Sequence, residues 1–157
     1  MSFRECLPSD PEATKLLNSY FTSRELGFVG SSGYKIVFPG DVQFIPPHGV
    51  FLVVETDAGP TGCGGIRAIE SALPNERWFE VKHLWLEPGS RGLGLGGKLL
   101  DELERRAIEF GATDSVLDTN SSLEAAAGLY RSRGYEPTEP YNDNPNATNW
   151  YRKTLRS

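Results

Sequence analysis

The chain has 157 residues, a formal net charge of −5 at pH 7, 24% charged residues and 38% hydrophobic residues. This length suits one domain and leaves no room for a second full domain, and the composition is ordinary for a globular protein. The acidic balance makes nucleic acid a poor partner, because affinity for nucleic acid depends on neutralising phosphates with Lys and Arg.

Targeting and metal signals are weak. The N-terminus lacks the long apolar core of a signal peptide, and the longest strongly apolar run, residues 50–54, is too short to span a bilayer. We therefore expect a cytoplasmic protein with no membrane partner. Cys6 and Cys63 are far apart and match no metal-ligand spacing, so no metal is expected.

A helix is predicted near the N-terminus. Asp10, Pro11 and Glu12 form a strong helix start, because an acidic capping residue precedes a proline in the first turn. The apolar residues that follow have helical spacing, which turns one face of the helix toward a core. These residues are Ala13, Leu16, Leu17, Tyr20 and Phe21. The helix is predicted to end near Gly27.

Three strands are predicted in the middle of the chain. Residues 50–56 begin with a continuous apolar run, which indicates a buried strand. Residues 57–60 are typical of a hairpin turn, and residues 63–68 are the predicted return strand. Residues 78–86 form the next strand, which leads through a short turn into a glycine-rich loop.

The loop runs into a second predicted helix, which stops at Gly111. Its apolar residues again have helical spacing. They are Leu95, Leu99, Leu103, Ala107 and Phe110.

The rest of the chain alternates in the same way. Residues 116–118 predict a short strand, and Ser121 with Glu124 forms a capping box for a helix that ends at Gly134. Residues 149–155 predict a last strand. The order of a strand, a helix, several strands and then β-α-β-α-β indicates an α/β (α+β) fold with a mixed central sheet, in a single domain.

The glycine-rich loop fits three anion-binding motifs at once. Residues 91–99 read RGLGLGGKL, which contains G-x-G-x-x-G, most of a P-loop, and R-x-x-G-x-G. Each motif sets backbone N–H groups and a helix N-terminus against phosphate, and glycine lets the backbone approach the anion closely.

Two of these motifs fit poorly. A dinucleotide-binding fold begins with a strand that is apolar on both faces, whereas residues 80–86 mix charged and apolar side chains. The 39 residues after Asp118 (119 to 157) are also too few for its remaining crossovers. A P-loop needs a hydroxyl after its lysine, but Leu99 follows Lys98. A loop without a ligand would leave Arg91 and the alternating glycines unexplained.

The stretch from residue 79 to residue 135 resembles the GNAT superfamily of acetyl-CoA-dependent N-acetyltransferases. Residues 91–96 match the family's pyrophosphate loop, Q/R-x-x-G-x-G/A, and residues 80–88 match the strand before it. Residues 126–135 match the later helix, A-x-x-L-Y-x-x-x-G-F/Y, and residues 150–155 are similar to the last strand of the family. The family often has Asn three residues before the alanine at position 126, where this chain has Leu123.

The resemblance implies a GNAT-like domain in which acetyl-CoA lies where two parallel strands, here 78–86 and 116–118, splay apart. The backbone of Leu84, Trp85 and Leu86 would then bind pantetheine and polarise the thioester carbonyl. The predicted phosphate-binding residues are Arg91, Gly92, Leu93, Gly94, Leu95, Gly96, Gly97 and Lys98. Whether Asn120 also contacts the coenzyme stays open, and we regard Arg131 and Arg133 as solvated helix charges.

The catalytic predictions also follow from the resemblance. Glu80 matches a strand glutamate that serves as the base in histone-type members, and Tyr130 matches the tyrosine that protonates the departing thiolate. Alternatively, Glu80 pairs with Lys82 or Lys98. His83 and, less favourably, His48 are other candidate bases, because imidazole titrates near neutral pH. Strand alternation sets His83 on the opposite face from Glu80 unless a bulge intervenes.

The predicted reaction is direct acetyl transfer to a primary amine in a ternary complex. The resemblance implies an acceptor pocket built from the segment after the first helix and the loop before the last strand, here residues 28–38 and 141–145. Their aromatic residues, glycines and one acid favour a small polar amine, although a peptide N-terminus also fits. The competing interpretation is a catalytically silent CoA-binding regulatory module. Family members are often homodimers, so a homodimer is possible.

Overall fold

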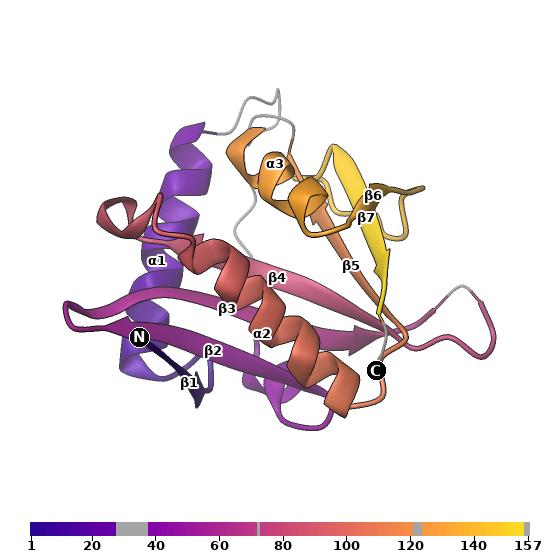
Figure 1. The fold of residues 1–157 in the computed structure, drawn as a ribbon, viewed down its shortest axis with the longest axis horizontal. Coiled ribbons are helices and arrows are strands. Elements are labelled where there is room, and N and C mark those ends of the chain that lie inside the picture. The colour runs from indigo at the N-terminus through magenta and orange to yellow at the C-terminus, as the bar shows by residue number, and fades with distance from the viewer. Residues whose placement is uncertain (28–37, 72, 121–123, 156–157) are drawn as a thin grey trace.

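The computed structural model describes residues 1–27, 38–71, 73–120 and 124–155. The elements, in chain order, are β1 (Ser2–Cys6), α1 (Pro11–Gly27), η1 (Asp41–Phe44), β2 (Gly49–Thr56), β3 (Gly59–Ile69), β4 (Trp78–Leu86), η2 (Pro88–Ser90), α2 (Leu95–Glu109), β5 (Asp114–Thr119), α3 (Glu124–Ser132), β6 (Glu136–Pro137) and β7 (Asn149–Thr154). The strands form one seven-stranded sheet in the order β1-β2-β3-β4-β5-β7-β6 (Figure 1). The predicted α/β fold with a mixed sheet is confirmed.

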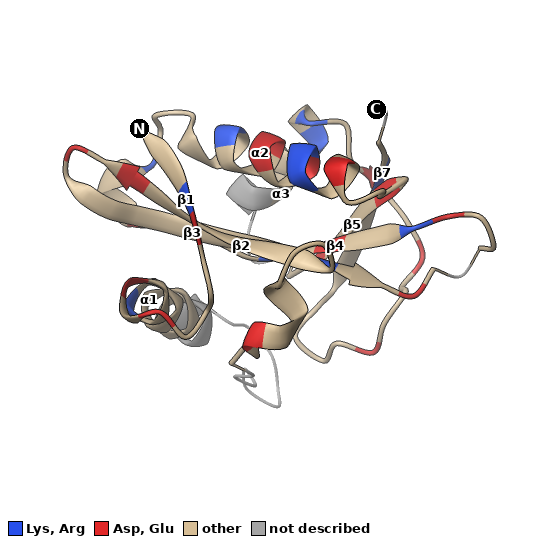
Figure 2. Cartoon of the chain, turned by 90° about the horizontal axis from the view of Figure 1, so that it is seen from below, with Lys and Arg blue, Asp and Glu red and all other residues tan. Residues whose placement is uncertain are grey.

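The two faces of the sheet are covered by different helices. Helix α1 lies against one face, and α2 and α3 lie against the other (Figure 2). Each helix layer encloses its own apolar core, so β2 is buried on both faces and its run of residues 50–54 is apolar throughout. On the α1 side the core includes Ala13, Leu16, Leu17, Tyr20, Phe21, Phe51 and Val53. On the α2 side it includes Val50, Leu52, Phe79, Val81, Leu99, Leu103 and Tyr130.

Several predicted bounds agree closely with the structure. β4 has the predicted bounds, α1 ends at the predicted Gly27, and the apolar face predicted for α1 is buried. The first strand, to which the sequence pattern assigned no residues, is β1, and β5 is longer than predicted. Ser121 of the predicted capping box lies outside the described residues.

The strand directions exclude the dinucleotide-binding fold. β1 to β4 are consecutive antiparallel neighbours, and β5 is antiparallel to β7. The pair β4 and β5 is parallel, and α2 supplies the crossover that such a pair requires. A dinucleotide-binding sheet is mostly parallel, so this topology does not match it.

In the parts of the chain that the structure describes, no helix combines the length and apolarity needed to cross a membrane.

Candidate active site

The parallel strands β4 and β5 part in the middle of the sheet. Their backbone pairing runs from Trp78 opposite Asp114 to Glu80 opposite Val116, and no later pair joins them. β4 nevertheless continues to Leu86, while β5 continues to Thr119 in register with β7. The β4 edge from residue 81 to residue 86 therefore carries backbone N–H and C=O groups that β5 does not bind.

A β-bulge lies in β4 just beyond this point. Between Gly65 opposite Lys82 and Cys63 opposite Trp85, β4 contains one more residue than β3, and His83 has a positive φ of 59°. Alternation is thereby broken, so the imidazole of His83 packs against Tyr20 and Phe21 of α1.

Strand alternation alone would set His83 on the opposite face of the sheet from Glu80, and the bulge places both residues on the same face. Glu80 and Arg67 lie directly opposite each other, on the α1 side of the sheet. His83 shares this side, whereas Leu84 packs against the core on the α2 side. The other histidine, His48, precedes β2, and its N–H donates to the carbonyl oxygen of Ile45 in a turn.

The glycine-rich loop has the backbone that an anion cradle requires. Gly92 and Gly94 have φ values of 80° and 77°, which residues with a Cβ rarely adopt. A Cβ at either position would have no other atom within 4 Å, so the backbone there is open to a ligand. Gly94 is the N-cap of α2 and offers no side-chain cap, and the first turn of α2 has no acidic residue. The N–H groups of Leu95, Gly96 and Gly97 therefore precede the first helical hydrogen bond, in which Lys98 donates to Gly94.

The side chains of the loop differ in exposure. Leu93 and Lys98 are exposed, whereas Leu95 and Gly97 are buried against the rest of the domain. Gly96 packs close to Leu129 of α3, which holds α3 beside the start of α2.

Arg91 lies on the α1 side of the loop. Its Nε donates to the carbonyl oxygen of Leu86 at 3.1 Å, and its guanidinium stacks on the Trp85 ring with Cζ 4.7 Å from the ring centre. Arg91 and Trp85 line a groove of about 800 Å³ between α1 and the end of β4. Lys15 and Asn18 of α1 also border this groove. In this structure Arg91 therefore contacts the end of β4.

Glu80 is buried, with 2% of its side chain exposed, and its carboxylate accepts several hydrogen bonds. Arg67 donates from Nη2 and Nε to Oε1 at 2.9 and 3.1 Å, and Arg67 also bonds to Gln43 of η1. Tyr141 donates to Oε2 at 2.7 Å. The sequence predicted Lys82 or Lys98 as a structural partner, and Lys82 does lie 3.8 Å from Oε2, but the closer cation is Arg67.

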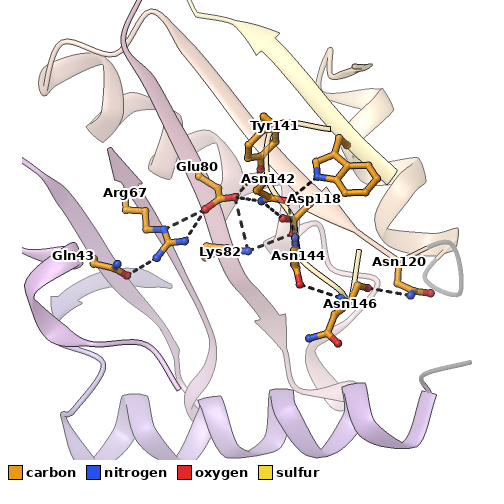
Figure 3. A network of polar contacts seen from close by, with 11 residues as sticks. Gln43, Arg67, Glu80, Lys82, Asp118, Asn120, Tyr141, Asn142, Asn144 and Asn146 are labelled. Carbon is orange, nitrogen blue, oxygen red and sulfur yellow. Dashed lines mark hydrogen bonds and ion pairs between the residues drawn. The ribbon is translucent and has the colours of Figure 1, made fainter. Parts of the chain in front are cut away.

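A second carboxylate, Asp118 of β5, faces Glu80 across the splay (Figure 3). Lys82 reaches from β4 to within 3.3 Å of Asp118 Oδ1. Asn142 donates to Asp118 Oδ2 at 2.7 Å and to Glu80 Oε2 at 3.3 Å, and Asn144 donates to Asp118 Oδ1 at 3.2 Å. The loop before β7 thus covers both carboxylates with amide and phenol donors.

Burial shapes the protonation of this cluster. Burial, together with the negative charges of Glu80 and Asp118, raises the pKa of Tyr141 far above its ordinary value. Tyr141 is therefore protonated at neutral pH and donates to Glu80.

Asn120 lies at the far end of the same network. Its Nδ2 donates to the backbone oxygen of Asn146, so in this structure it supports the loop before β7. Of the two segments predicted to build the acceptor pocket, residues 141–145 belong to the loop that covers the carboxylates, whereas residues 28–37 lie outside the described residues. Sequence reasoning missed Arg67 as the partner of Glu80, although a cross-strand pair of opposite charges would have indicated it once the register was known.

Tyr130 lies in the core between the sheet and the α2–α3 layer. Its ring is 5% exposed and lies 6.1 Å from the ring of Tyr135 and 6.2 Å from that of Tyr151. Arg133, predicted to be a solvated helix charge, is partly solvated: its side chain is 36% exposed, and its guanidinium packs over Gly97 in the first turn of α2.

The fold and the site define a mixed α/β domain with a glycine-rich helix start beside a splayed pair of parallel strands. Residues 13–135 match the model of the acetyltransferase (GNAT) family. The chain therefore belongs to the GNAT acetyltransferase family.

Individual proteins agree with this assignment. An uncharacterized N-acetyltransferase of Schizosaccharomyces pombe is 39% identical over 103 residues, which cover 66% of this chain and 61% of the relative. The chain thus spans about three fifths of the length of the first curated relatives that it matches, at 61% each.

Solved structures match over nearly the whole chain. A candidate acyl-CoA N-acyltransferase from Klebsiella pneumoniae has a TM-score of 0.76 at 26% identity and covers 99% of this chain and 97% of its own. A GNAT family acetyltransferase from Elizabethkingia anophelis, solved with acetyl-CoA bound, has a TM-score of 0.65 at 14% identity, with 98% and 97% covered, and shares the fold.

Proposed function

We propose that this protein transfers the acetyl group of acetyl-CoA to a primary amine of a small molecule, by direct attack in a ternary complex. The observation that carries the proposal is the end of β4–β5 pairing at Glu80, beyond which β4 runs on beside a glycine-rich helix start. An unpaired strand edge suits an extended ligand chain, and a helix N-terminus suits a phosphate group at one end of it. Acetyl-CoA has both features, and membership of the GNAT family supports acetyl-CoA as the ligand.

The residues present fit acetyl-CoA, which supplies an activated thioester when bound. Uncapped N–H groups at the start of α2 suit its diphosphate. Lys98 lies in the first turn of α2, whereas Arg91, three residues before the N-cap, would have to leave its contacts with Leu86 and Trp85 to bind a phosphate. The N–H and C=O groups of Leu84, Trp85 and Leu86, on the β4 edge that β5 leaves unpaired, suit the amide-bearing pantetheine arm. A backbone N–H at this edge would also stabilise negative charge on the carbonyl oxygen.

The acceptor amine must lose a proton before or during attack. An alkyl amine of pKa about 10.4 is neutral about once in 2,500 molecules at pH 7, so the free base costs about 4.6 kcal/mol. We assign proton removal to Glu80, acting through a water molecule because Arg67, Tyr141 and Asn142 already donate to its carboxylate. His83, which shares the α1 side of the sheet, is the alternative base.

Tyr130 is the proposed donor of a proton to the CoA thiolate. Its place on α3, within the A-x-x-L-Y pattern, supports this role, and its hydroxyl is the only chemistry its side chain offers. From ordinary pKa values, transfer from a phenol to a thiolate is uphill by about 2 kcal/mol, which a site that stabilises the phenolate would offset.

A small acceptor is favoured by the loop before β7. Tyr141, Asn142 and Asn144 close over the two carboxylates, which leaves less room for an extended peptide than an open groove would. Two alternatives remain: an enzyme that acetylates a peptide, and a module that binds CoA without transferring an acetyl group.

Turnover against a panel of amines tests the proposal. The chain is incubated with acetyl-CoA and amino acids, aliphatic amines, aromatic amines or short peptides, and both free CoA and the acetylated product are measured by chromatography and mass spectrometry. We expect equal amounts of CoA and an acetylated small amine. Binding of CoA without product from any amine would favour the regulatory module, and product from peptides alone would favour the peptide acceptor.

A further inference from the structure

Arg67 of β3 lies beside Glu80, at the point where β4 and β5 part. The two residues are directly opposite each other in the register of β3 and β4, and Glu80 is also the last residue of β4 that pairs with β5. The side chain of Arg67 is 25% exposed, whereas that of Glu80 is 2% exposed. A molecule that approaches the splay from the α1 side therefore meets the guanidinium before it meets the carboxylate.

The guanidinium of Arg67 is held in place, but its donors are not all used. Nε and Nη2 donate to Glu80 Oε1, and Nη1 donates to the side-chain oxygen of Gln43 in η1 (Figure 3). A guanidinium has five N–H groups. One N–H on Nη1 and one on Nη2 therefore make no hydrogen bond to the residues that the structure describes. Arg67 keeps two donors for a second anion, and a carboxylate is the anion that suits a guanidinium best among amine metabolites.

The charges around the splay are balanced without a ligand. Arg67 and Lys82 are cations, and Glu80 and Asp118 are anions. A simple alkyl ammonium would add a positive charge to this partly buried cluster, and a buried charge without a partner is costly. An amino acid adds no net charge, because its carboxylate accompanies its ammonium group.

The same balance matters when the acceptor loses its proton. In the proposed function the proton leaves the ammonium group and passes through water to the carboxylate of Glu80. Neutral Glu80 no longer compensates the charge of Arg67, with which it shares its closest ion pair. A carboxylate on the acceptor would supply the negative charge that Arg67 then lacks.

Arg67 is better placed for this role than Lys82. Nζ of Lys82 lies 3.3 Å from Asp118 Oδ1 and 3.8 Å from Glu80 Oε2, so it already has two carboxylate neighbours. Arg67 has one carboxylate partner within the described ranges, and it is the more exposed of the two cations.

We propose that Arg67 binds the carboxylate of an α-amino acid whose amino group receives the acetyl group. The carboxylate would accept the two remaining N–H groups of the guanidinium, and the α-amino group, one carbon away, would lie near Glu80 and the splay. This inference rests on the proposed function, because it names the class of acceptor for the same site. It separates a free amino acid from a peptide N-terminus, where the neighbouring carboxyl group is an amide.

Matched acceptors test the inference on the wild-type chain at saturating acetyl-CoA. A set of L-amino acids is compared with the corresponding amides and with the amines that lack the carboxyl group. Because charged hydrogen bonds to the carboxylate are lost, kcat/KM should be about tenfold or more lower for the amides and the amines. Equal values, or acetylation of amides and amines alone, would overturn the inference and leave the proposed function intact. If no acceptor of any kind is acetylated, the proposed function fails instead.

The variant R67K separates recognition of the acceptor from support of Glu80. It keeps a positive charge beside Glu80 but removes the planar fork. We expect KM for the amino acid to rise about tenfold, while kcat/KM for the matching amine stays nearly unchanged. The matched control is R105M, which removes an exposed arginine that pairs with Glu102 and Glu109 of α2 and should change neither value.

An equal loss of kcat/KM for both acceptors in R67K would mean that Arg67 supports Glu80 without contacting the acceptor, and the inference would be wrong. The comparison of acceptors on the wild-type chain does not depend on the folding of R67K, so it decides the question if this variant does not fold.

Discussion

Replacing Asn142 with Ala should loosen the loop that covers the two carboxylates of the splay. The side-chain amide donates to Asp118 at 2.7 Å and to Glu80 at 3.3 Å, and its oxygen accepts from Trp150 at 2.9 Å and from the backbone of Asn144 at 3.2 Å. Both hydrogens and both lone pairs of the amide are therefore used.

The size of the effect follows from these four contacts. A hydrogen bond contributes about 0.5–1.5 kcal/mol net, and more when one partner is charged. The bonds of Asn142 with Glu80 and with Asn144 are long, at 3.3 and 3.2 Å, and should contribute less than the other two. Asp118 and Glu80 keep other donors, so the free energy of unfolding should fall by about 2–4 kcal/mol rather than by the full sum. For a chain of this size, the melting temperature should fall by about 4–16 °C.

Urea denaturation of N142A and a matched control measures this change. D143A alters the exposed neighbouring residue and should stay within about 0.5 kcal/mol of wild type. If N142A and D143A are equally stable, the amide of Asn142 does not hold the loop, and its four hydrogen bonds do not stabilise the fold.

Other consequences concern the acid, the glycines and the thiols. Y130F should leave the Kd for acetyl-CoA unchanged and lower kcat, and an undiminished rate would remove Tyr130 from the acid role. G128A should raise the free energy of unfolding by about 0.5–1 kcal/mol, because Gly128 lies in a helix with open space around its Cα. G94A should lower the free energy of unfolding, because Gly94 has a φ of 77°. Urea denaturation of both variants shows whether the two changes have opposite signs. Burial raises the pKa of Cys6 from 9.0 to about 11, so its stabilising contribution is present below pH 9 and is lost as the pH rises through about 11. At pH 8 its reaction with a disulfide reagent should be about 100-fold slower in the folded chain than in denaturant, and equal rates would contradict this burial.

The local elements could be predicted because each carries its own pattern. α1 has a capping residue, a proline and an apolar face, and β4 is bounded by a turn at one end and Pro88 at the other. The glycine-rich loop is encoded in contiguous residues. Since these signals are local, neither the fold class nor the loop required knowledge of tertiary contacts.

The arrangement around Glu80 could not be predicted in the same way. Arg67 pairs with Glu80 because of the β3–β4 register, which depends on the connection between the strands and not on the strand pattern. The bulge at His83 depends on the same pairing. Tyr141 lies 61 residues from Glu80 in sequence, so only the fold brings the two together.

The same limit applies to Arg133. Arg131 and Arg133 are two residues apart at the end of α3 and just beyond it, and the sequence pattern gives no reason to distinguish the two. Packing of α3 against the start of α2 separates them, since Arg133 covers Gly97 whereas Arg131 is exposed.

Titration calorimetry of the wild-type chain with acetyl-CoA, NADH and ATP measures which coenzyme the chain binds. We expect saturable binding of one acetyl-CoA per chain, because the splayed strand pair and the glycine-rich helix start of the described residues would form one site. Binding of NADH or ATP in preference to acetyl-CoA would contradict this expectation.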